Sequence, residues 1–161
     1  MKDETRQIMK AKKAFDGIKI LKGQSISIAT CDGDGVPNVA PIGSMRIVDE
    51  ETVHVLQGFL CRTFGNLKKN PKAMFSVCVN SSLWETIGFF KDRSSSVLGY
   101  QVYCEYTGAD DSRTAVERES RLISNRVPFV FRGLFLRFCR NHLSRILTFK
   151  IKEVRVIASP S

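Results

Sequence analysis

The sequence predicts a mainly β, α+β protein of about six strands and three helices, in which a mostly antiparallel sheet closes into a barrel. Segments that alternate apolar and polar residues follow one another along the chain, separated by turns rich in glycine and aspartate. Strands that are adjacent in sequence favour antiparallel pairing, and closure removes the exposed edges. The longer amphipathic helical patterns are confined to the N-terminus and to the region after residue 110.

The size and composition of the chain indicate a single domain covering residues 1–161. Hydrophobic residues make up 43% of the 161 positions, which is enough for a substantial core. Lys and Arg number 25 against 16 Asp and Glu, so the net charge of +9 favours an anionic partner. Nine of these cations lie between Arg121 and Arg155, against one acid, Glu153.

Cysteine and histidine usage gives no sign of a metal site. The five cysteines are odd in number, widely spaced and never in a C-x-x-C pair, which argues against a disulfide framework and a zinc site. His54 lies in an expected strand and His142 in an expected helix, where structural roles are the more common ones. The first 22 residues are charged and lack the apolar core of a signal peptide, so we expect a soluble, cytoplasmic protein with no transmembrane segment.

The N-terminal third predicts a helix followed by a hairpin. Residues Thr5 to Leu21 place Ile8, Ala11, Phe15 and Ile18 at helical spacing, so this side should pack on the sheet. A strand at 25–30 follows, and the Asp-Gly-rich residues 31–35 suit a hairpin turn. The next strand, Pro37 to Val48, contains Pro41 and Gly43, which suit a bulge or the close approach of a ligand better than an ordinary central strand.

The remaining strands are expected at 52–56, 72–79, 99–108 and 146–157, with helices at 112–124 and 129–143. The last helix sets its aromatic and aliphatic residues against several arginines. Residues 80–98, which include Trp84, Phe89 and Phe90, have no clear pattern and are expected to form a long loop.

The stretch from Cys61 to Pro71 predicts a phosphate-binding segment. Arg62 and Lys68 or Lys69 supply positive charge, Thr63 supplies a hydroxyl, and a short helix starting near Thr63 would offer unpaired N–H groups to an anion. Pro71 then ends the helix. In the alternative interpretation, Thr63 is an N-cap and the lysines form a solvated helix face.

These motifs occur in a defined order. A strand, an Asp-Gly turn and a strand with Pro-Ile-Gly-Ser-Met (41–45) come first, and a further strand leads to Arg-Thr-Phe-Gly-Asn-Leu-Lys-Lys-Asn-Pro (62–71). The set resembles the FMN-binding split-barrel superfamily that includes pyridoxamine 5′-phosphate oxidase, best from Ile28 to Val79 and again from Gly99 to Gly108. The resemblance implies a six-stranded antiparallel split β-barrel with flanking helices, which dimerises and binds FMN at the subunit interface.

Matching the motifs position by position implies a set of cofactor-binding residues. The isoalloxazine ring would lie along the second strand, the ribityl chain beside the end of the third, and the phosphate on the basic stretch. In this order the residues are Ile42, Gly43, Ser44 and Met45 for the ring, Leu56 and Gln57 for the ribityl chain, Arg62 and Thr63 for the phosphate, and Gln101 for the far side of the ring. Asn66 and Lys68 complete the set, although each also suits capping or solvating the short helix.

The resemblance implies a flavin oxidoreductase with a small-molecule redox partner, and it names no catalytic side chain, because the flavin carries out the electron transfer. Residues 152–161 lack the arginine and histidine motif that holds the substrate in true pyridoxamine phosphate oxidases, so we do not expect vitamin B6 oxidation.

Three alternatives remain: the deazaflavin F420 as cofactor, a nucleic-acid-binding role for the basic segment, and a membrane-surface role for Phe129 to Leu143. Nucleic acid is the less favoured partner, because the aromatic residues are not interleaved with the cations for base stacking. A homodimer is expected because a small barrel covers one face of a flavin, and Trp84, Phe89 and Phe90 are candidates for the shared surface.

Overall fold

The computed structural model describes residues 2–17, 26–58, 60–78 and 97–158. The expected loop at 80–98, with Trp84, Phe89 and Phe90, lies outside these ranges except for residues 97 and 98, which belong to a strand. In chain order the elements are α1 (Lys2–Asp16), β1 (Ile26–Cys31), β2 (Pro37–Ile42), β3 (Met45–Ile47), β4 (Thr52–Gln57), α2 (Cys61–Lys69), β5 (Lys72–Cys78), β6 (Val97–Asp110), α4 (Arg113–Ile123), the 3₁₀ turns η2 (Ser124–Arg126) and η3 (Phe129–Phe131), α5 (Arg132–His142) and β7 (Arg145–Ala158). In the part of the chain that is described, no helix is both long and apolar enough to cross a bilayer.

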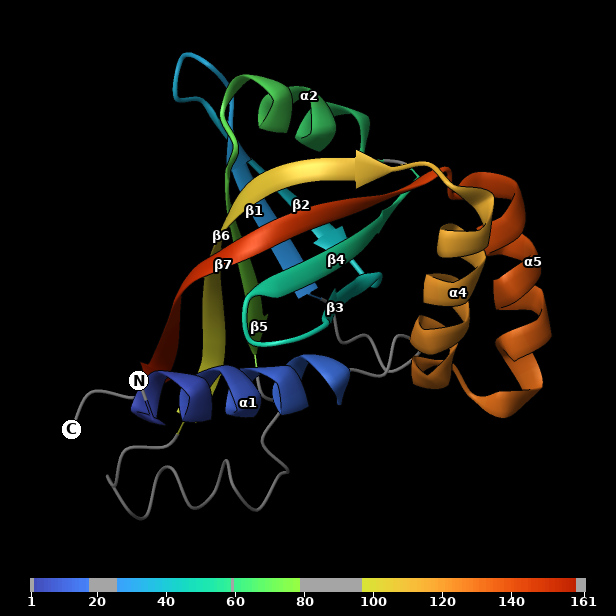
Figure 1. Cartoon of the computed structure of the whole chain (residues 1–161), viewed down its shortest axis with the longest axis horizontal. Helices are drawn as coiled ribbons and strands as arrows, with labels where there is room; N and C mark the ends of the chain where they lie inside the picture. Colours follow the sequence, from blue (N-terminus) through green and yellow to red (C-terminus); the bar gives the residue numbers. More distant parts are fainter. Residues whose placement is uncertain (1, 18–25, 59, 79–96, 159–161) are drawn as a thin grey trace.

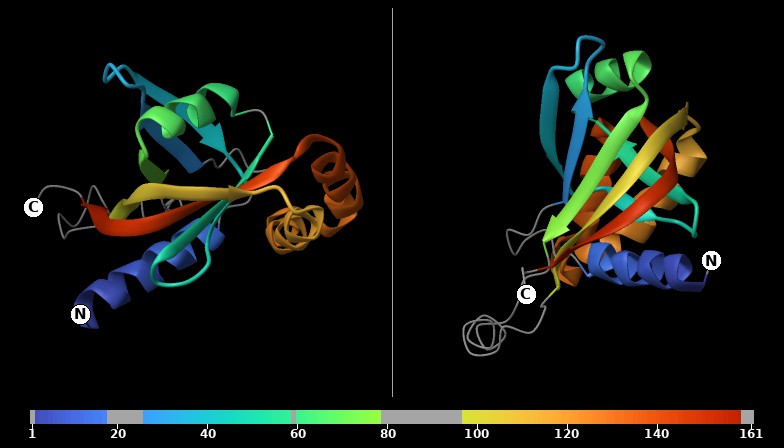
Figure 2. Two further views of the ribbon diagram at one scale, coloured as in Figure 1. Left: turned by 45° about the horizontal axis from the view of Figure 1, so that its top comes forward. Right: turned by 90° about the vertical axis from the view of Figure 1, so that its left-hand side faces the viewer.

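Seven antiparallel strands form one sheet in the order β2-β1-β5-β6-β7-β4-β3. The strands β2 and β3 therefore occupy opposite edges of the sheet, although Gly43 and Ser44 alone separate them in sequence. Because a residue advances the chain by at most about 3.5 Å, the two edges must come close together and the sheet must curl strongly. Figures 1 and 2 show this curled half-barrel.

Two details of the predicted fold are corrected by this topology. The expected single strand from Pro37 to Val48 is two strands that pair with different partners, β2 with β1 and β3 with β4, so the sheet has seven strands and not six. The strands β2 and β3, both described in full, share no ladder, so the sheet curls into a half-barrel without closing. The break lies at the glycine that the sequence marks as unsuited to a regular strand.

Helices cover both ends and one flank of the curled sheet. In Figure 1, α1 lies across one end and α2 lies at the opposite end, while α4 and α5 lie side by side on the flank. The α1 helix begins at Lys2 and ends at Asp16, where Gly17 N–H donates to Lys13 O at 2.9 Å, earlier than the expected end at Leu21. Of its predicted core residues, Ile8, Ala11 and Phe15 are buried, as expected, and Ile18 lies outside the described residues.

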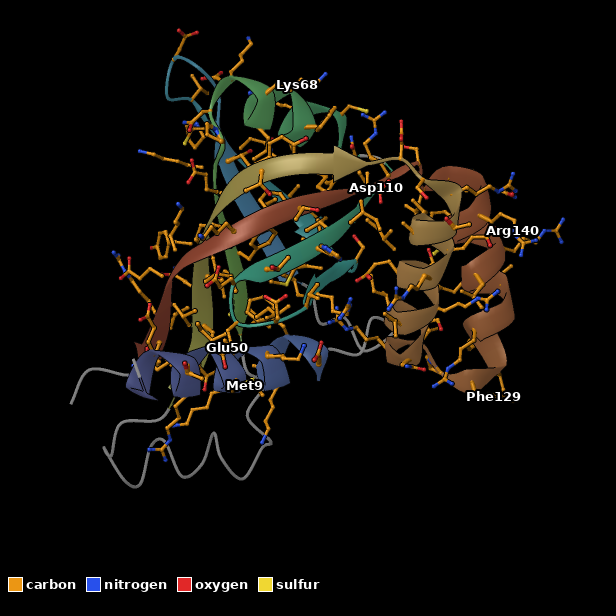
Figure 3. All side chains as sticks on the ribbon, in the orientation of Figure 1. Met9, Glu50, Lys68, Asp110, Phe129 and Arg140 are labelled. Atoms are coloured by element: carbon orange, nitrogen blue, oxygen red, sulfur yellow. The ribbon has the colours of Figure 1, made fainter. Side chains whose placement is uncertain are left out.

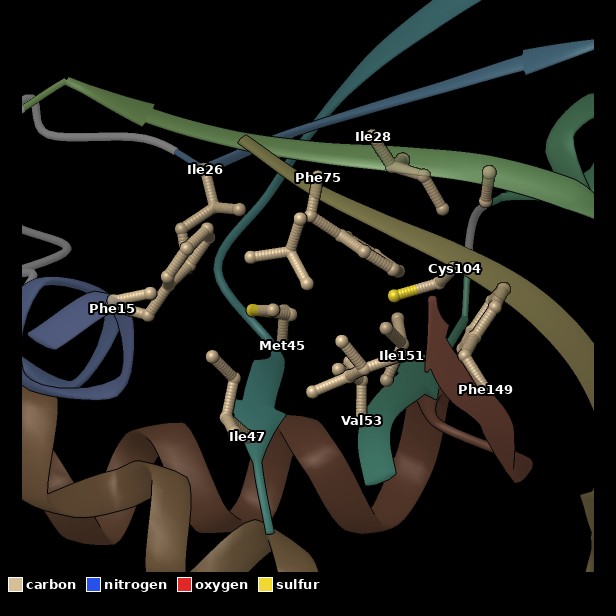
Figure 4. Close-up of a cluster of buried hydrophobic side chains, with 14 of the residues drawn as sticks. Phe15, Ile26, Ile28, Met45, Ile47, Val53, Phe75, Cys104, Phe149 and Ile151 are labelled. Atoms are coloured by element: carbon tan, nitrogen blue, oxygen red, sulfur yellow. The ribbon is translucent and has the colours of Figure 1, made fainter. Parts of the chain in front are cut away.

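The main core fills the inside of the curl. Figure 4 shows Phe15 of α1 beside Ile26, with Met45, Phe75 and Phe149 further along the interior. The rings of Phe75 and Phe149 meet edge to face, with centroids 5.1 Å apart. A second, smaller cluster on the outer side of β4 and β7 joins the sheet to the helical flank through Leu56, Val116, Ile123 and Ile146.

The predicted hairpin turn is confirmed. Asp32 Oδ1 accepts hydrogen bonds from the N–H groups of Asp34 and Val36, at 3.0 and 2.9 Å. Gly35 has a φ of +83°, a conformation that favours glycine. The turn thereby fixes the register of β1 against β2, which pairs Ile28 with Ala40.

Candidate cofactor site

The break between β2 and β3 is held against the end of β4. Ser44 Oγ donates a hydrogen bond to Leu56 O at 2.8 Å, and Leu56 N–H donates to Ser44 O at 3.2 Å. These two bonds place Gly43 and Ser44, neither of which belongs to a strand, next to the exit of β4. The backbone at this point is therefore positioned without being part of a regular ladder.

A pocket of about 270 Å³ opens at this break. Its lining is apolar apart from one serine. On one side the lining comes from the β2–β3 joint and the end of β4, and on the other side from α5 and the residue that follows α5. The lining residues are Pro41, Ile42, Gly43, Ser44, Leu56, Gly58, Leu60, Phe135, Phe138 and Leu143. An apolar cleft beside an irregular stretch of backbone suits a flat ligand with polar groups along one edge.

Gly58 sets the distance between the two sides of the pocket. A Cβ atom at this position would lie 2.7 Å from Leu143 Cδ2 and 2.8 Å from His142 O. Only glycine fits here without movement, because real Cβ atoms do not approach other atoms so closely. The end of β4 and the end of α5 therefore pack as tightly as backbone allows.

The N-terminus of α2 lies next to the pocket, because its N-cap residue, Leu60, is part of the lining. Leu60 provides no side-chain cap, and the first turn of the helix holds no acid. The N–H groups of that turn are thus available to an anion. Arg62 is exposed in this turn, and Thr63 is buried, with its Oγ1 accepting a hydrogen bond from Asn38 Nδ2 at 3.1 Å.

A buried ion pair lies behind the sheet wall of the pocket, which Ile42 to Ser44 and Leu56 form. Glu119 of α4 is 4% exposed and accepts two hydrogen bonds from Arg46 of β3, Nε to Oε1 at 2.5 Å and Nη2 to Oε2 at 2.9 Å. His54 Nδ1 of β4 lies 3.6 Å from Glu119 Oε2. Burial alone would raise the pKa of the Glu119 carboxyl, but its contacts with His54 and Arg46 lower this pKa to about 2. The carboxylate therefore ties α4 to β3 and β4.

A second buried cation, Arg126 of η2, braces the β2–β3 joint. Its Nη1 donates to Met45 O at 2.5 Å and, more weakly, to Gly43 O at 3.5 Å. Its Nη2 pairs with Asp16 Oδ1 of α1 at 2.9 Å. Burial lowers the pKa of Arg126, and the pairing with Asp16 opposes this effect. One side chain thus joins α1, η2 and the backbone that forms the floor of the pocket.

Comparison with known proteins identifies the family. Residues 15–156 match the sequence model of the pyridoxamine 5′-phosphate oxidase family. The chain belongs to this family. The resemblance that the motifs indicated is therefore confirmed, and the half-barrel with its flanking helices is a pyridoxamine 5′-phosphate oxidase-like split barrel.

Solved structures of the same fold include proteins with different cofactors in their names. An FMN-binding protein from Syntrophomonas wolfei subsp. wolfei is similar with a TM-score of 0.69 and 20% identity, over 97% of this chain and 89% of that one. An F420 reductase is similar with a TM-score of 0.58 and 13% identity, over 89% and 94% of the two chains. At such identities these likenesses show the fold.

A relative in sequence is an uncharacterized protein of Methanocaldococcus jannaschii. It is 37% identical over 57 residues, which are 34% of this chain. The match spans 38% of the length of that curated relative.

The structure of this pyridoxamine 5′-phosphate oxidase family member brings part of the expected residue set together. Ile42, Gly43, Ser44 and Leu56 line the pocket, and Arg62 and Thr63 lie in the first turn of the adjoining helix. The side chain of Met45 points into the main core (Figure 4), so its backbone is the part nearer the pocket.

The other expected residues are not part of the pocket lining. Gln57 is buried, and its Oε1 has no hydrogen-bond partner among the residues that the structure describes. Asn66 is buried against β1 and donates to Thr30 Oγ1 at 3.3 Å, and Lys68 lies over the ring of Phe64 at 4.6 Å in the last turn of α2. Gln101 alternates with the core residues of β6 and accepts a hydrogen bond from Tyr103 at 3.2 Å, on the face of β6 away from the core.

Sequence reasoning missed the helical wall and the buried charges. Phe135, Phe138 and Leu143 line the pocket, and their helical spacing indicated an apolar face but not its partner. Glu119 and Arg126 lie in segments that resemble solvated basic helices, and no local signal marks their burial. Gly58 could have been found, since a glycine directly after a strand often marks a close backbone approach.

Proposed function

We propose that the protein binds FMN, with the isoalloxazine ring in the pocket at the β2–β3 break, and acts as an FMN-dependent oxidoreductase. The observation that carries the proposal is this pocket, in which apolar walls meet an irregular stretch of backbone at Gly43 and Ser44. The apolar walls suit the ring faces, and the backbone suits the polar ring edge. Membership of the pyridoxamine 5′-phosphate oxidase family supports a flavin over unrelated ligands.

The phosphate of FMN would lie at the N-terminus of α2. Leu60 leads from the pocket lining directly into the first turn, where Arg62 offers a charge and the N–H groups lack a side-chain cap. The hydroxyl of Thr63 already accepts from Asn38 and retains its own proton, which it can donate to a phosphate oxygen. Charge, amides and hydroxyl together form a suitable anion site.

The pocket lining described here carries no ionisable side chain. Its residues can bind and orient a ring and exclude water from it, but they offer no general acid or base. A bound flavin supplies the electron and hydride transfer by its own chemistry, with a small-molecule redox partner.

We propose that FMN binds between two copies of the chain. The pocket, of about 270 Å³, opens at the surface of one copy, and because ligand sites usually bury most of their ligand, a second copy would cover the face of the flavin that the first leaves open. We propose that Gln101, on the face of β6 away from the core, contacts the flavin bound by the second copy. FMN should shift dissociation of the dimer to lower protein concentration. Analytical ultracentrifugation with and without FMN measures this shift, and a monomer that binds FMN at full stoichiometry would contradict the dimeric site.

The deazaflavin F420 is the alternative cofactor. Its acidic tail would suit Arg137 and Arg140, which are exposed on α5 next to the pocket residues Phe135 and Phe138. Parallel titrations with FMN and F420 separate the two proposals, because the true cofactor should bind more tightly by a clear margin.

The absorbance spectrum of the purified protein tests the proposed function directly. Flavin bands in the near ultraviolet and blue, or their appearance after addition of FMN, would support it. A colourless protein that takes up neither FMN nor F420 would exclude it.

Substitution of Arg62 tests the assignment of the phosphate site. Arg62→Ala should weaken FMN binding by about 1.5 to 3 kcal/mol and leave riboflavin, which has no phosphate, nearly unaffected. Lys69→Ala, at the exposed far end of the same helix, is the matched control and should change neither affinity by much. Equal losses for FMN and riboflavin in the Arg62 variant would show that Arg62 is not a phosphate ligand.

A further inference from the structure

Large apolar side chains are exposed where the helical hairpin turns from α4 into α5. They are Phe129 (82% exposed), Val130 (78%), Phe131 (49%), Leu134 (70%) and Phe138 (42%), and together we call them the hairpin-tip patch. Figure 3 shows Phe129 at the end of the hairpin that points away from the sheet. Exposed apolar patches on soluble domains usually mark interaction surfaces.

The fold does not use the hairpin-tip patch for its own core. Phe131, Leu134 and Phe138 are spaced by three and four residues, so they lie along one side of α5. The contacts that hold α5 in place come from other positions, through Cys139, which is buried, and Phe135, which packs on the second core cluster. Phe138 has a tilted ring contact with His142, 4.8 Å between centroids, and still exposes much of its surface.

Along the chain, the basic residues that flank the patch are not interrupted by an acid, and Asp16 of α1, which lies near the tip, is paired with Arg126 at 2.9 Å. From Arg121 to Lys152 the sequence contains eight basic residues and no acid. Among these, Arg121 precedes the tip on α4, and Arg137 follows it on α5, both exposed. Such a surface is complementary to an anionic one.

We propose that the hairpin-tip patch docks on an anionic membrane surface, with its apolar side chains in the interfacial region and the flanking arginines at the lipid headgroups. Apolar residues next to Arg and Lys are the composition that peripheral membrane elements share. Phe138 belongs both to the patch and to the cofactor pocket, so the docked surface is continuous with the proposed flavin site.

Two other partners fit these observations less well. A second copy that closes the flavin site would cover Phe138, which lines the pocket, but Phe129, Val130 and Leu134 at the tip are not part of that lining. At the tip a two-fold interface would appose identical patches with the same arginines, and like charges repel. A nucleic acid would gain from Phe129 and Phe131 through base stacking, but it would gain little from Val130 and Leu134, which are equally prominent. Lipid acyl chains accept aromatic and aliphatic side chains alike.

Cosedimentation of the full chain with vesicles tests the proposal. The protein should bind vesicles of phosphatidylcholine mixed with phosphatidylglycerol, should bind pure phosphatidylcholine much less, and should dissociate as NaCl rises. Val130→Asp should weaken binding at least about tenfold, because it replaces an exposed valine, which would be buried among the lipids on docking, with a negative charge. Val39→Asp, on the exposed face of β2 at 66% exposure, makes the same change away from the tip and should leave binding unchanged.

Charge substitutions give a second measurement. Arg137→Gln should weaken binding about fivefold, whereas Arg113→Gln, at the other end of α4, should have a smaller effect. Absence of binding to anionic vesicles, or equal losses for Val130→Asp and Val39→Asp, would overturn the proposal. A different sedimentation coefficient for Val130→Asp, but not for Val39→Asp, would also overturn it, because it would mark a contact between copies of the chain. The proposal would likewise fail if the wild type bound an oligonucleotide and no vesicles, and Val130→Asp lost the oligonucleotide binding.

Discussion

The two walls of the pocket are built in different ways. The sheet wall, at Ile42 to Ser44 and Leu56, is fixed by strand pairing on both sides of the break and braced from behind by Arg126 and Glu119. The helical wall is one side of α5, which buries Cys139 alone among its eleven residues. In contrast, α4 buries Val116, Glu119, Ser120 and Ile123.

The difference shows which side of the site the fold determines. Buried, hydrogen-bonded charges tolerate little displacement, because any gap leaves a charge without a partner in a poorly solvated place. An amphipathic helix held by a few apolar contacts can shift at lower cost. We therefore expect the sheet wall to keep its geometry and the helical wall to adjust to the ligand and to the surface on which it docks.

The largest expected effect comes from removing the charge behind the sheet wall. Glu119→Gln should lower the free energy of unfolding by about 3 kcal/mol, because it leaves Arg46 partly buried without its counter-ion. Glu117→Gln, two positions away on the same helix and near Arg113 and Arg140, should cost less than about 1 kcal/mol, since those pairs are exposed. Urea denaturation measures both values, and equal losses would show that the buried pair does not brace the wall.

The same carboxylate predicts a pH dependence. Its pKa is about 2 in the folded protein against an ordinary value of 4.5, so its stabilisation is complete above about pH 4.5 and is lost as the pH falls toward 2. Over that window the wild type should lose about 3 kcal/mol more stability than Glu119→Gln, which has no group to titrate there. Glu117→Gln should follow the wild-type curve. Parallel curves for wild type and Glu119→Gln would contradict the low pKa.

Local sequence patterns predicted much of the sheet wall but not its assembly. Pro41 and Gly43 indicated that the second strand was irregular, and the break occurs there. That β2 and β3 lie at opposite edges depends on the order of the five strands between them, which is set by long-range pairing. The number of strands was therefore one too low in the prediction, although each segment was identified.

Burial of charge could not be predicted from the sequence. Glu119 is buried against Arg46, which lies 73 residues before it in the chain, and Arg126 is buried with Asp16 as its partner, 110 residues before it. Partners so distant in sequence leave no local pattern. For α5 the periodicity identified the apolar side, but the hairpin leaves most of that side exposed. Periodicity indicates which residues share a face and does not identify what that face contacts.

The smallest expected effects test the contact between the two walls, and they should have opposite signs. Gly58→Ala would place a methyl group against Leu143 and His142 O, so the end of α5 must move, at a cost of about 2 kcal/mol and with weaker FMN binding. Gly65→Ala, inside α2 with no atom within 4 Å of the new Cβ, should stabilise the protein by up to about 1 kcal/mol and leave the pocket unchanged.

Thermal unfolding and flavin titration of both variants separate a rigid contact from an adjustable one. For each variant we compare the loss of FMN affinity with the loss of stability. If the helical wall adjusts as its sparse burial indicates, this ratio should be larger for Gly58→Ala than for Glu119→Gln, because Gly58→Ala changes the spacing of the walls directly. A neutral Gly58→Ala would show that the end of α5 yields without cost. The close approach of Gly58 to Leu143 would then not set the width of the pocket.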